Sequence, residues 1–138
     1  MDNRMMIGRV GAAGFALAAA AGAAWVAYFD PTTAGFFPVC PLNRMTGYAC
    51  PGCGLTRGFH ALFHGDVLGA MGYNALIPVW ALLFGYLFLS LALFSVRGRG
   101  LPMKALMHPV VLWSLLLVLL IFGVVRNLPF YPFTLLYP

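Results

Sequence analysis

The sequence predicts an all-α membrane protein with three transmembrane helices and a short helical hairpin, extracytoplasmic or partly re-entrant, between the first and the second. Of its 138 residues, 62% are hydrophobic and 8% are charged, whereas soluble domains carry about 25% charged residues. Three apolar runs approach the roughly 20 residues that a helix needs to cross a bilayer. A chain of this length supplies a single membrane domain over residues 1–138.

The three apolar runs cover residues 10–29, 75–96 and 109–128. The third run reaches full length only if residues 126–128 lie at the membrane interface. The first run follows two arginines and resembles a secretory signal. Its aromatic end, WVAYF, is typical of an interface anchor and therefore favours a span that is retained.

One face of the first run consists of small residues. Gly14, Ala18 and Gly22 recur at every fourth position, and a face of this kind lets a second helix approach closely. We expect a partner membrane protein or a second copy of the chain to dock there.

The basic residues predict the topology. Five of the eight lie before the first run or in the loop at 97–104, and the positive-inside bias places both segments in the cytoplasm. The N-terminus is then cytoplasmic, and the cysteine segment and the C-terminus are extracytoplasmic. The basic residues flank apolar runs and form no patch with aromatic side chains, which argues against nucleic acid as a partner.

Residues 40–74 predict the hairpin between the first two spans. The stretch opens irregularly, with a turn at 46–47, and becomes helical after residue 54. At 100° per residue, Arg57, His60 and His64 share one side of this helix, and Cys53 joins them if it begins the helix.

Turn and capping residues bound the second helix of the hairpin. Gly65 can end the first helix in a left-handed conformation, and Asp66 can cap the next one. Asn74 can cap the second span, and Asp66 can alternatively pair with Arg57.

The same segment carries a family resemblance. Residues 50–57 read CPGCGLTR, and the flanking matches are Cys40-Pro41, Thr46-Gly47 and His64-Gly65-Asp66 leading to Asn74. With its Cys-Pro-x-Cys-Gly-x-Thr-Arg motif, the chain resembles the small bacterial membrane proteins of domain of unknown function twenty-seven fifty-two. The resemblance implies a protein of the bacterial inner (plasma) membrane with few spans and no assigned activity.

The cysteines allow three interpretations. Cys50 and Cys53 form a Cys-x-x-Cys pair, which lets two thiolates reach one tetrahedral ion. Cys40 and either His60 or His64 would complete a Cys₃His zinc site. Alternatively, the pair acts in thiol redox chemistry, or the cysteines form a disulfide that pins the loop. Three is an awkward number for disulfides and a natural one for a metal ion completed by histidine.

Arg57 and Arg44 are candidates for contact with anionic lipid headgroups, since the outer side carries more arginines than carboxylates. No charge lies at the centre of any span, which argues against a pump or an ion channel. The sequence therefore predicts a non-enzymatic accessory or scaffold protein with an extracytoplasmic cysteine cluster that binds zinc. The alternative is a membrane thiol-disulfide oxidoreductase.

Overall fold

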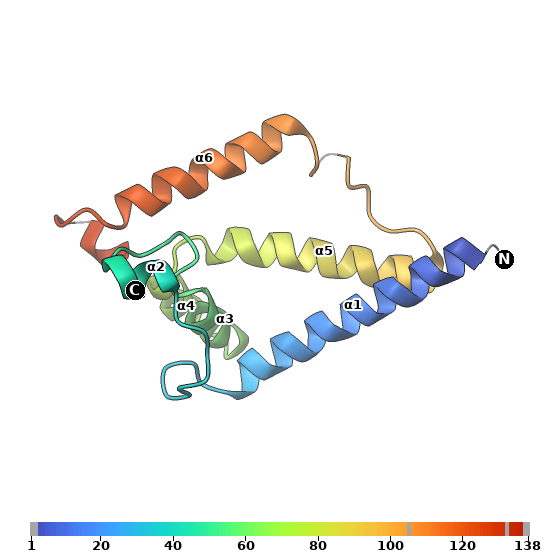
Figure 1. The fold of residues 1–138 in the computed structure, drawn as a ribbon, viewed down its shortest axis with the longest axis horizontal. Coiled ribbons are helices and arrows are strands. Elements are labelled where there is room, and N and C mark those ends of the chain that lie inside the picture. Colours follow the sequence, from blue (N-terminus) through green and yellow to red (C-terminus); the bar gives the residue numbers. More distant parts are fainter. Residues whose placement is uncertain (1–2, 105, 132, 137–138) are drawn as a thin grey trace.

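The computed structural model describes residues 3–104, 106–131 and 133–136. This part of the chain is helical and contains no β-strand. Its elements are α1 (Asn3–Tyr28), α2 (Pro41–Thr46), α3 (Leu55–Phe63), α4 (Val67–Tyr73), α5 (Ile77–Arg97), α6 (Pro109–Val125) and a 3₁₀ turn, η1 (Phe133–Leu136). The predicted all-α class and the two-helix hairpin, α3 and α4, are thus observed (Figure 1).

Two helices, α1 and α5, are long and apolar enough to cross a membrane. The first begins at Asn3, seven residues before the predicted run, and Arg9 in this added stretch finds acceptors on α5. The second begins at Ile77 rather than at residue 75, since Leu76 is its N-cap and Pro78 occupies its first turn.

The third apolar run forms α6, a helix of 17 residues, so the third span predicted over 109–128 is not confirmed. The helix ends at Val125 because Arg126 turns into the protein instead of extending along the interface. Arg126 is 0% exposed. Apart from Phe122, the side chains of α6 are half-buried or exposed.

The helices α1 and α5 meet at one end and diverge towards the hairpin, which fills the angle between them (Figure 1). Gly8 lies against Phe94 at the narrow end. There Arg9 donates hydrogen bonds from Nε to the Ser95 carbonyl (2.9 Å) and from Nη2 to the Val96 carbonyl (2.6 Å). These carbonyls belong to the last turn of α5, which has no intrahelical donors left for them.

The predicted small-residue face of α1 does not form this contact. A methyl group added at Gly14 or Gly22 would meet no atom within 4 Å, whereas the packed face contains Gly8 and the buried Ala12. The docking of a partner at the Gly14 face stays a prediction.

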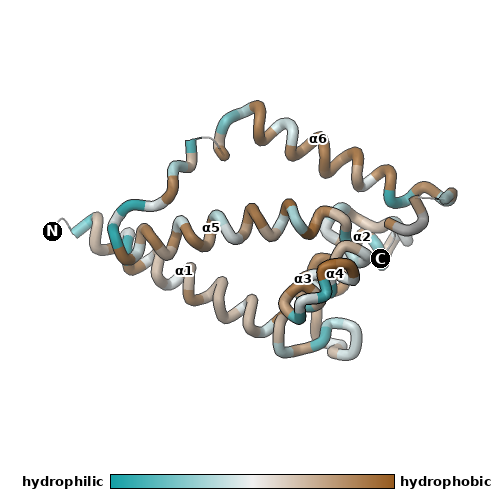
Figure 2. Tube along the Cα trace, turned by 180° about the vertical axis from the view of Figure 1, so that it is seen from behind, coloured by the Kyte–Doolittle hydropathy of each residue, from teal (hydrophilic) through white to brown (hydrophobic). Residues whose placement is uncertain are grey.

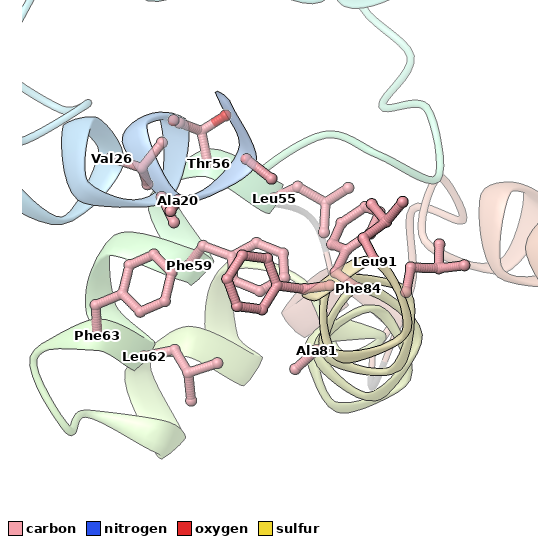
Figure 3. Close-up of a pocket in the computed structure, with 16 residues that line it drawn as sticks. Ala20, Val26, Leu55, Thr56, Phe59, Leu62, Phe63, Ala81, Phe84 and Leu91 are labelled. Atoms are coloured by element: carbon pink, nitrogen blue, oxygen red, sulfur yellow. The ribbon is translucent and has the colours of Figure 1, made fainter. Parts of the chain in front are cut away.

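An apolar pocket of about 840 Å³ opens in the angle between α1, α3 and α5 (Figure 3). Val26 from α1, Phe59 from α3 and Phe84 from α5 line it. The rings of Phe59 and Phe84 are 5.8 Å apart.

Hydrophilic residues gather at the ends of the long helices, while the lengths of α5 and α6 are hydrophobic (Figure 2). The helix α6 diverges from α5 in both views and reaches the hairpin region at its C-terminal end (Figures 1 and 2). That end carries the residues that hold the cysteine loop.

Candidate metal site

Three cysteines from separate turns converge in one place, and we call them the sulfur cluster: Cys40, Cys50 and Cys53. Cys50 lies in the middle, with its Sγ 3.4 Å from that of Cys40 and 3.3 Å from that of Cys53. The three sulfurs all lie within 4.8 Å of one another. Thiolates on one tetrahedral zinc ion, with Zn–S bonds of about 2.3 Å, are about 3.8 Å apart, so the cluster is compatible with a bound metal ion.

Local structure places each sulfur. Cys40 is the N-cap of α2, a helix that the sequence analysis missed. This helix has Pro41 at its first position and ends at Gly47, whose φ of 77° is left-handed. Cys50 and Cys53 flank a turn in which the Cys50 backbone N–H donates to the Cys53 sulfur (3.2 Å). The helix α3 begins at Leu55, so the expectation that Cys53 begins it is wrong.

Asn74 holds the cysteine loop from the start of α5. Its Nδ2 donates to the carbonyls of Pro51 (2.9 Å) and Cys53 (3.1 Å), and its Oδ1 accepts from the Leu76 N–H (2.9 Å). The side chain is 0% exposed. Asn74 is the C-cap of α4, and Leu76 rather than Asn74 is the N-cap of α5, because the Asn74 amide is drawn towards the loop.

Arg126 holds the same loop from the end of α6. Its Nη1 donates to the carbonyls of Cys50 (2.9 Å) and Cys53 (3.1 Å). The guanidinium also lies 4.9 Å from the centre of the Phe122 ring. Sequence analysis assigned Arg126 to the interface and missed this function.

Asn127 completes the attachment. Its Oδ1 accepts from the Ala49 N–H (2.7 Å), and its Nδ2 donates to the carbonyls of Ala49 (2.8 Å) and Gly123 (2.7 Å). Gly123 also faces Pro51, where an added methyl group would approach within 3.0 Å. The only sequence signal for this attachment is the polar pair Arg126-Asn127 directly after an apolar run.

The surroundings of Cys40 and Cys53 shift the pKa values of their thiols in opposite directions. Hydrogen bonds from the Asn43 backbone and from the neighbouring thiols lower the pKa of Cys40 from 9.0 to about 7. Burial, followed by the neighbouring sulfurs, raises the pKa of Cys53 to about 12. Cys53 is therefore disfavoured as a thiolate, because its sulfur is buried and lies before the start of α3. Cys40 therefore ionises more readily than Cys53.

The histidines lie elsewhere. The group of ligand atoms around the cluster, among the described residues, consists of the three sulfurs. The Nδ1 atom of His60 contacts the Val26 carbonyl in α1, and that of His64 contacts the His60 carbonyl, each at 2.8 Å. The structure thus brings together three of the five predicted metal ligands.

The remaining candidate residues, Asp66, Arg57 and Arg44, lie on or beside the short helices α2, α3 and α4. Asp66 is the N-cap of α4 and accepts from the Gly69 N–H (2.8 Å). Arg57 is exposed and lies 5.8 Å from the centre of the Tyr73 ring, and within the described residues no ion pair joins it to Asp66. Arg44 is exposed on α2. Contact of Arg57 and Arg44 with lipid stays a prediction.

Comparison with known proteins agrees with the family resemblance. Residues 40–88 match the family model described as Protein of unknown function (DUF2752). No curated protein and no solved structure matches the chain. The matched segment contains the sulfur cluster, the hairpin and the first half of α5. Over this segment, the chain is similar to the family of proteins of unknown function that the model describes.

Proposed function

We propose that the sulfur cluster binds a thiophilic metal ion, zinc in the simplest case, and that the protein is a non-enzymatic accessory or scaffold of the bacterial inner membrane. The observation that carries this proposal is the convergence of three sulfurs on a loop whose carbonyls are held by three side chains. Thiolates select soft or borderline ions such as Zn²⁺ and Cu⁺. A bound ion would tie α2 to the turn before α3 and supply folding free energy.

The long-range contacts support an extracytoplasmic cluster with the C-terminus on the same side. Arg126 and Asn127, at the end of α6, bond residues of the cysteine loop, which supports a topology with the end of α6 and the loop on the same side of the membrane. The basic loop at 97–104 lies at the other end of α5. We infer that α6 is the third span, although at 1.5 Å per residue its 17 residues reach only about 25 Å.

The apolar faces of α1 and α6 support the scaffold role. Phe15 and Leu17 on α1 and Trp113 on α6 are each at least 70% exposed. In a bilayer these faces meet lipid or another membrane helix. We propose a partner membrane protein or a second copy as the occupant, with anionic lipid at Arg57 and Arg44.

Metal analysis of the purified full chain tests the proposal. We expect close to one equivalent of zinc in the sulfur cluster, detected through the sulfur-to-cobalt charge-transfer absorption after exchange with Co²⁺. Cys50→Ser removes the central sulfur and should abolish this absorption, while Ser90→Ala, remote from the cluster, should preserve it. Metal-free protein that shows no cobalt–thiolate absorption on titration would refute the metal site.

A thiol-disulfide oxidoreductase is the second candidate. The specific observation in its favour is that Cys50 Sγ lies within 3.4 Å of two other thiols, one of which has a lowered pKa. In this reaction Cys50 attacks a substrate disulfide, and Cys53 then displaces the substrate. The substrate gains two thiols while Cys50 and Cys53 become a disulfide.

Trapping tests this alternative. Because Cys40 can also resolve a mixed disulfide on Cys50, the informative variant carries both Cys40→Ser and Cys53→Ser. A redox enzyme should accumulate substrate bound to Cys50, visible on non-reducing gels and lost on reduction. A variant that traps no partner in cells would exclude this chemistry.

A further inference from the structure

His60 and His64 form a second pair of metal-binding side chains, apart from the sulfur cluster. His60 lies in α3 and His64 is the C-cap of this helix, one turn later. Their ring centres are 4.4 Å from each other with an interplanar angle of 40°. Two imidazoles bound to one ion through bonds of about 2.0–2.1 Å place their ring centres about 4.5–5 Å apart. The observed pair is therefore close to the spacing that a shared ion needs.

The backbone determines which ring nitrogen carries the proton. The Nδ1 atom of His60 lies 2.8 Å from the Val26 carbonyl, and that of His64 lies 2.8 Å from the His60 carbonyl. Because a carbonyl can only accept, each Nδ1 donates, and each Nε2 keeps its lone pair for a ligand. Histidines that bind metals almost always donate their other N–H to a carbonyl or a carboxylate, which fixes the ring.

Asp30 adds a negative charge beside this pair. Its Oδ1 accepts from the backbone N–H and from the hydroxyl of Thr32, each at 2.8 Å. These bonds lower the pKa of Asp30, so its carboxylate is ionised at neutral pH and attracts a cation. Asp30 follows the end of α1, four residues after Val26, whose carbonyl contacts His60.

We propose that His60 and His64, through their Nε2 atoms, bind a divalent transition-metal ion such as Zn²⁺, with Asp30 as the neighbouring carboxylate. The ion would sit where the end of α1 meets α3 and would tie these helices together. Imidazole suits Zn²⁺, Cu²⁺ and Ni²⁺. The site uses none of the residues of the sulfur cluster and stands without it.

Equilibrium dialysis of the detergent-solubilised full chain against Zn²⁺ tests the site. His64→Ala is the informative variant because His64 is exposed and its loss leaves the contact between α1 and α3 in place. We expect it to bind one equivalent less than the unmodified protein. His108→Ala is the matched control, since His108 caps α6 through Nδ1 and should leave the stoichiometry unchanged.

Cobalt absorption separates this proposal from the sulfur site. His64→Ala should leave the cobalt–thiolate absorption intact. If the sulfur site binds no metal, this absorption is absent, but His64→Ala should still bind one equivalent of zinc less than the unmodified protein. Equal zinc stoichiometry in the two proteins would overturn the histidine site. So would an equal loss in His108→Ala.

The contribution of Asp30 has its own test. Asp30→Asn keeps an oxygen to accept from Thr32 and removes the charge, so we expect folded protein with zinc affinity at the histidine pair weakened about tenfold. Unchanged affinity would show that the carboxylate does not interact with the ion.

Discussion

The three thiols of the sulfur cluster differ in their surroundings. Cys40 caps α2 beside backbone N–H groups and is half-exposed, whereas Cys53 is 8% exposed and sits behind the loop. A backbone donor stabilises a thiolate, and burial among sulfurs disfavours one. The cluster therefore combines an easily ionised thiol, Cys40, with a thiol, Cys53, that loses its proton only with difficulty. A bound metal ion would replace the proton of Cys53.

Alkylation of metal-free protein should resolve the two thiols. A lowered pKa means that the Cys40 thiolate is present above about pH 7, so its reaction with iodoacetamide should rise between about pH 6 and pH 8 and then level off. Cys53, with its pKa raised to about 12, should stay unmodified over this range. Peptide mapping by mass spectrometry measures both rates. A midpoint near 9 for Cys40, or faster reaction of Cys53, would contradict the assignment.

Arg126 is the residue whose loss should disturb the loop most. Arg126→Met leaves the Cys50 carbonyl with only the Cys53 N–H as a donor and removes one of two side-chain donors from the Cys53 carbonyl. Hydrogen bonds from charged groups contribute about 1.5–3 kcal/mol each, so we expect at least about 2 kcal/mol of lost unfolding free energy and weaker metal binding. Reversible unfolding in mixed micelles measures the loss.

Arg44→Met is the control for this change, because Arg44 is exposed on α2. Substitutions at such positions change stability by about 0.5 kcal/mol or less. Similar losses in the two variants would show that Arg126 does not hold the loop.

At the scale of elements, the hairpin depends on close contact between α3, α4 and α5. Gly58 of α3 is buried, and a methyl group added there would lie 2.6 Å from Ile77 Cδ1 and 3.1 Å from the Ala70 carbonyl oxygen. Ile77 is 1% exposed and Ala70 is 0% exposed. The absence of a side chain at position 58 therefore lets α3 approach both neighbours.

Gly58→Ala should separate these helices. Overpacking costs about 1–3 kcal/mol, which exceeds the roughly 1 kcal/mol that alanine contributes through helix propensity. In Gly72→Ala, on the neighbouring helix α4, the added methyl group meets no atom within 4 Å, so this variant should keep or slightly gain stability. Thermal unfolding of both proteins measures the difference, and equal melting temperatures would refute the packing role of Gly58.

At the scale of the whole molecule, the contacts that organise the fold gather at the two ends of the long helices. Arg9 joins α1 to the last turn of α5 at one end. At the other end, Asn74, Arg126 and Asn127 join the cysteine loop to α5 and α6. Between these ends, the long helices expose large apolar side chains.

Thiol labelling in intact cells should reveal the orientation. After the metal has been removed with a chelator, a membrane-impermeant maleimide should label Cys40 from outside, because the proposed topology places the sulfur cluster there. Arg99→Cys, in a background with serine at positions 40, 50 and 53, puts a single thiol in the basic loop, and this thiol should react only after the cells are permeabilised. Labelling of the residue 99 thiol, and not of Cys40, in intact cells would show that the topology is opposite to the one proposed.

The sequence alone predicted the helical class, the two long spans and the α3–α4 hairpin, because hydropathy and the 3.6-residue period are local properties of the chain. It also identified the cysteines as the chemically distinctive residues. It missed α2, whose six residues are too few to show a period, and it placed the end of the third span at an interface.

Tertiary structure decided the rest. Cys40 is ten residues from Cys50, and no local rule brings them together. The loop carbonyls at positions 50 and 53 lack partners in regular secondary structure, and Arg126 satisfies them across more than 70 residues of sequence. The same packing turns His60 towards Val26 of α1 and away from the sulfurs. Buried polar groups must find hydrogen-bond partners wherever the fold offers them, and only the folded chain determines where those partners lie.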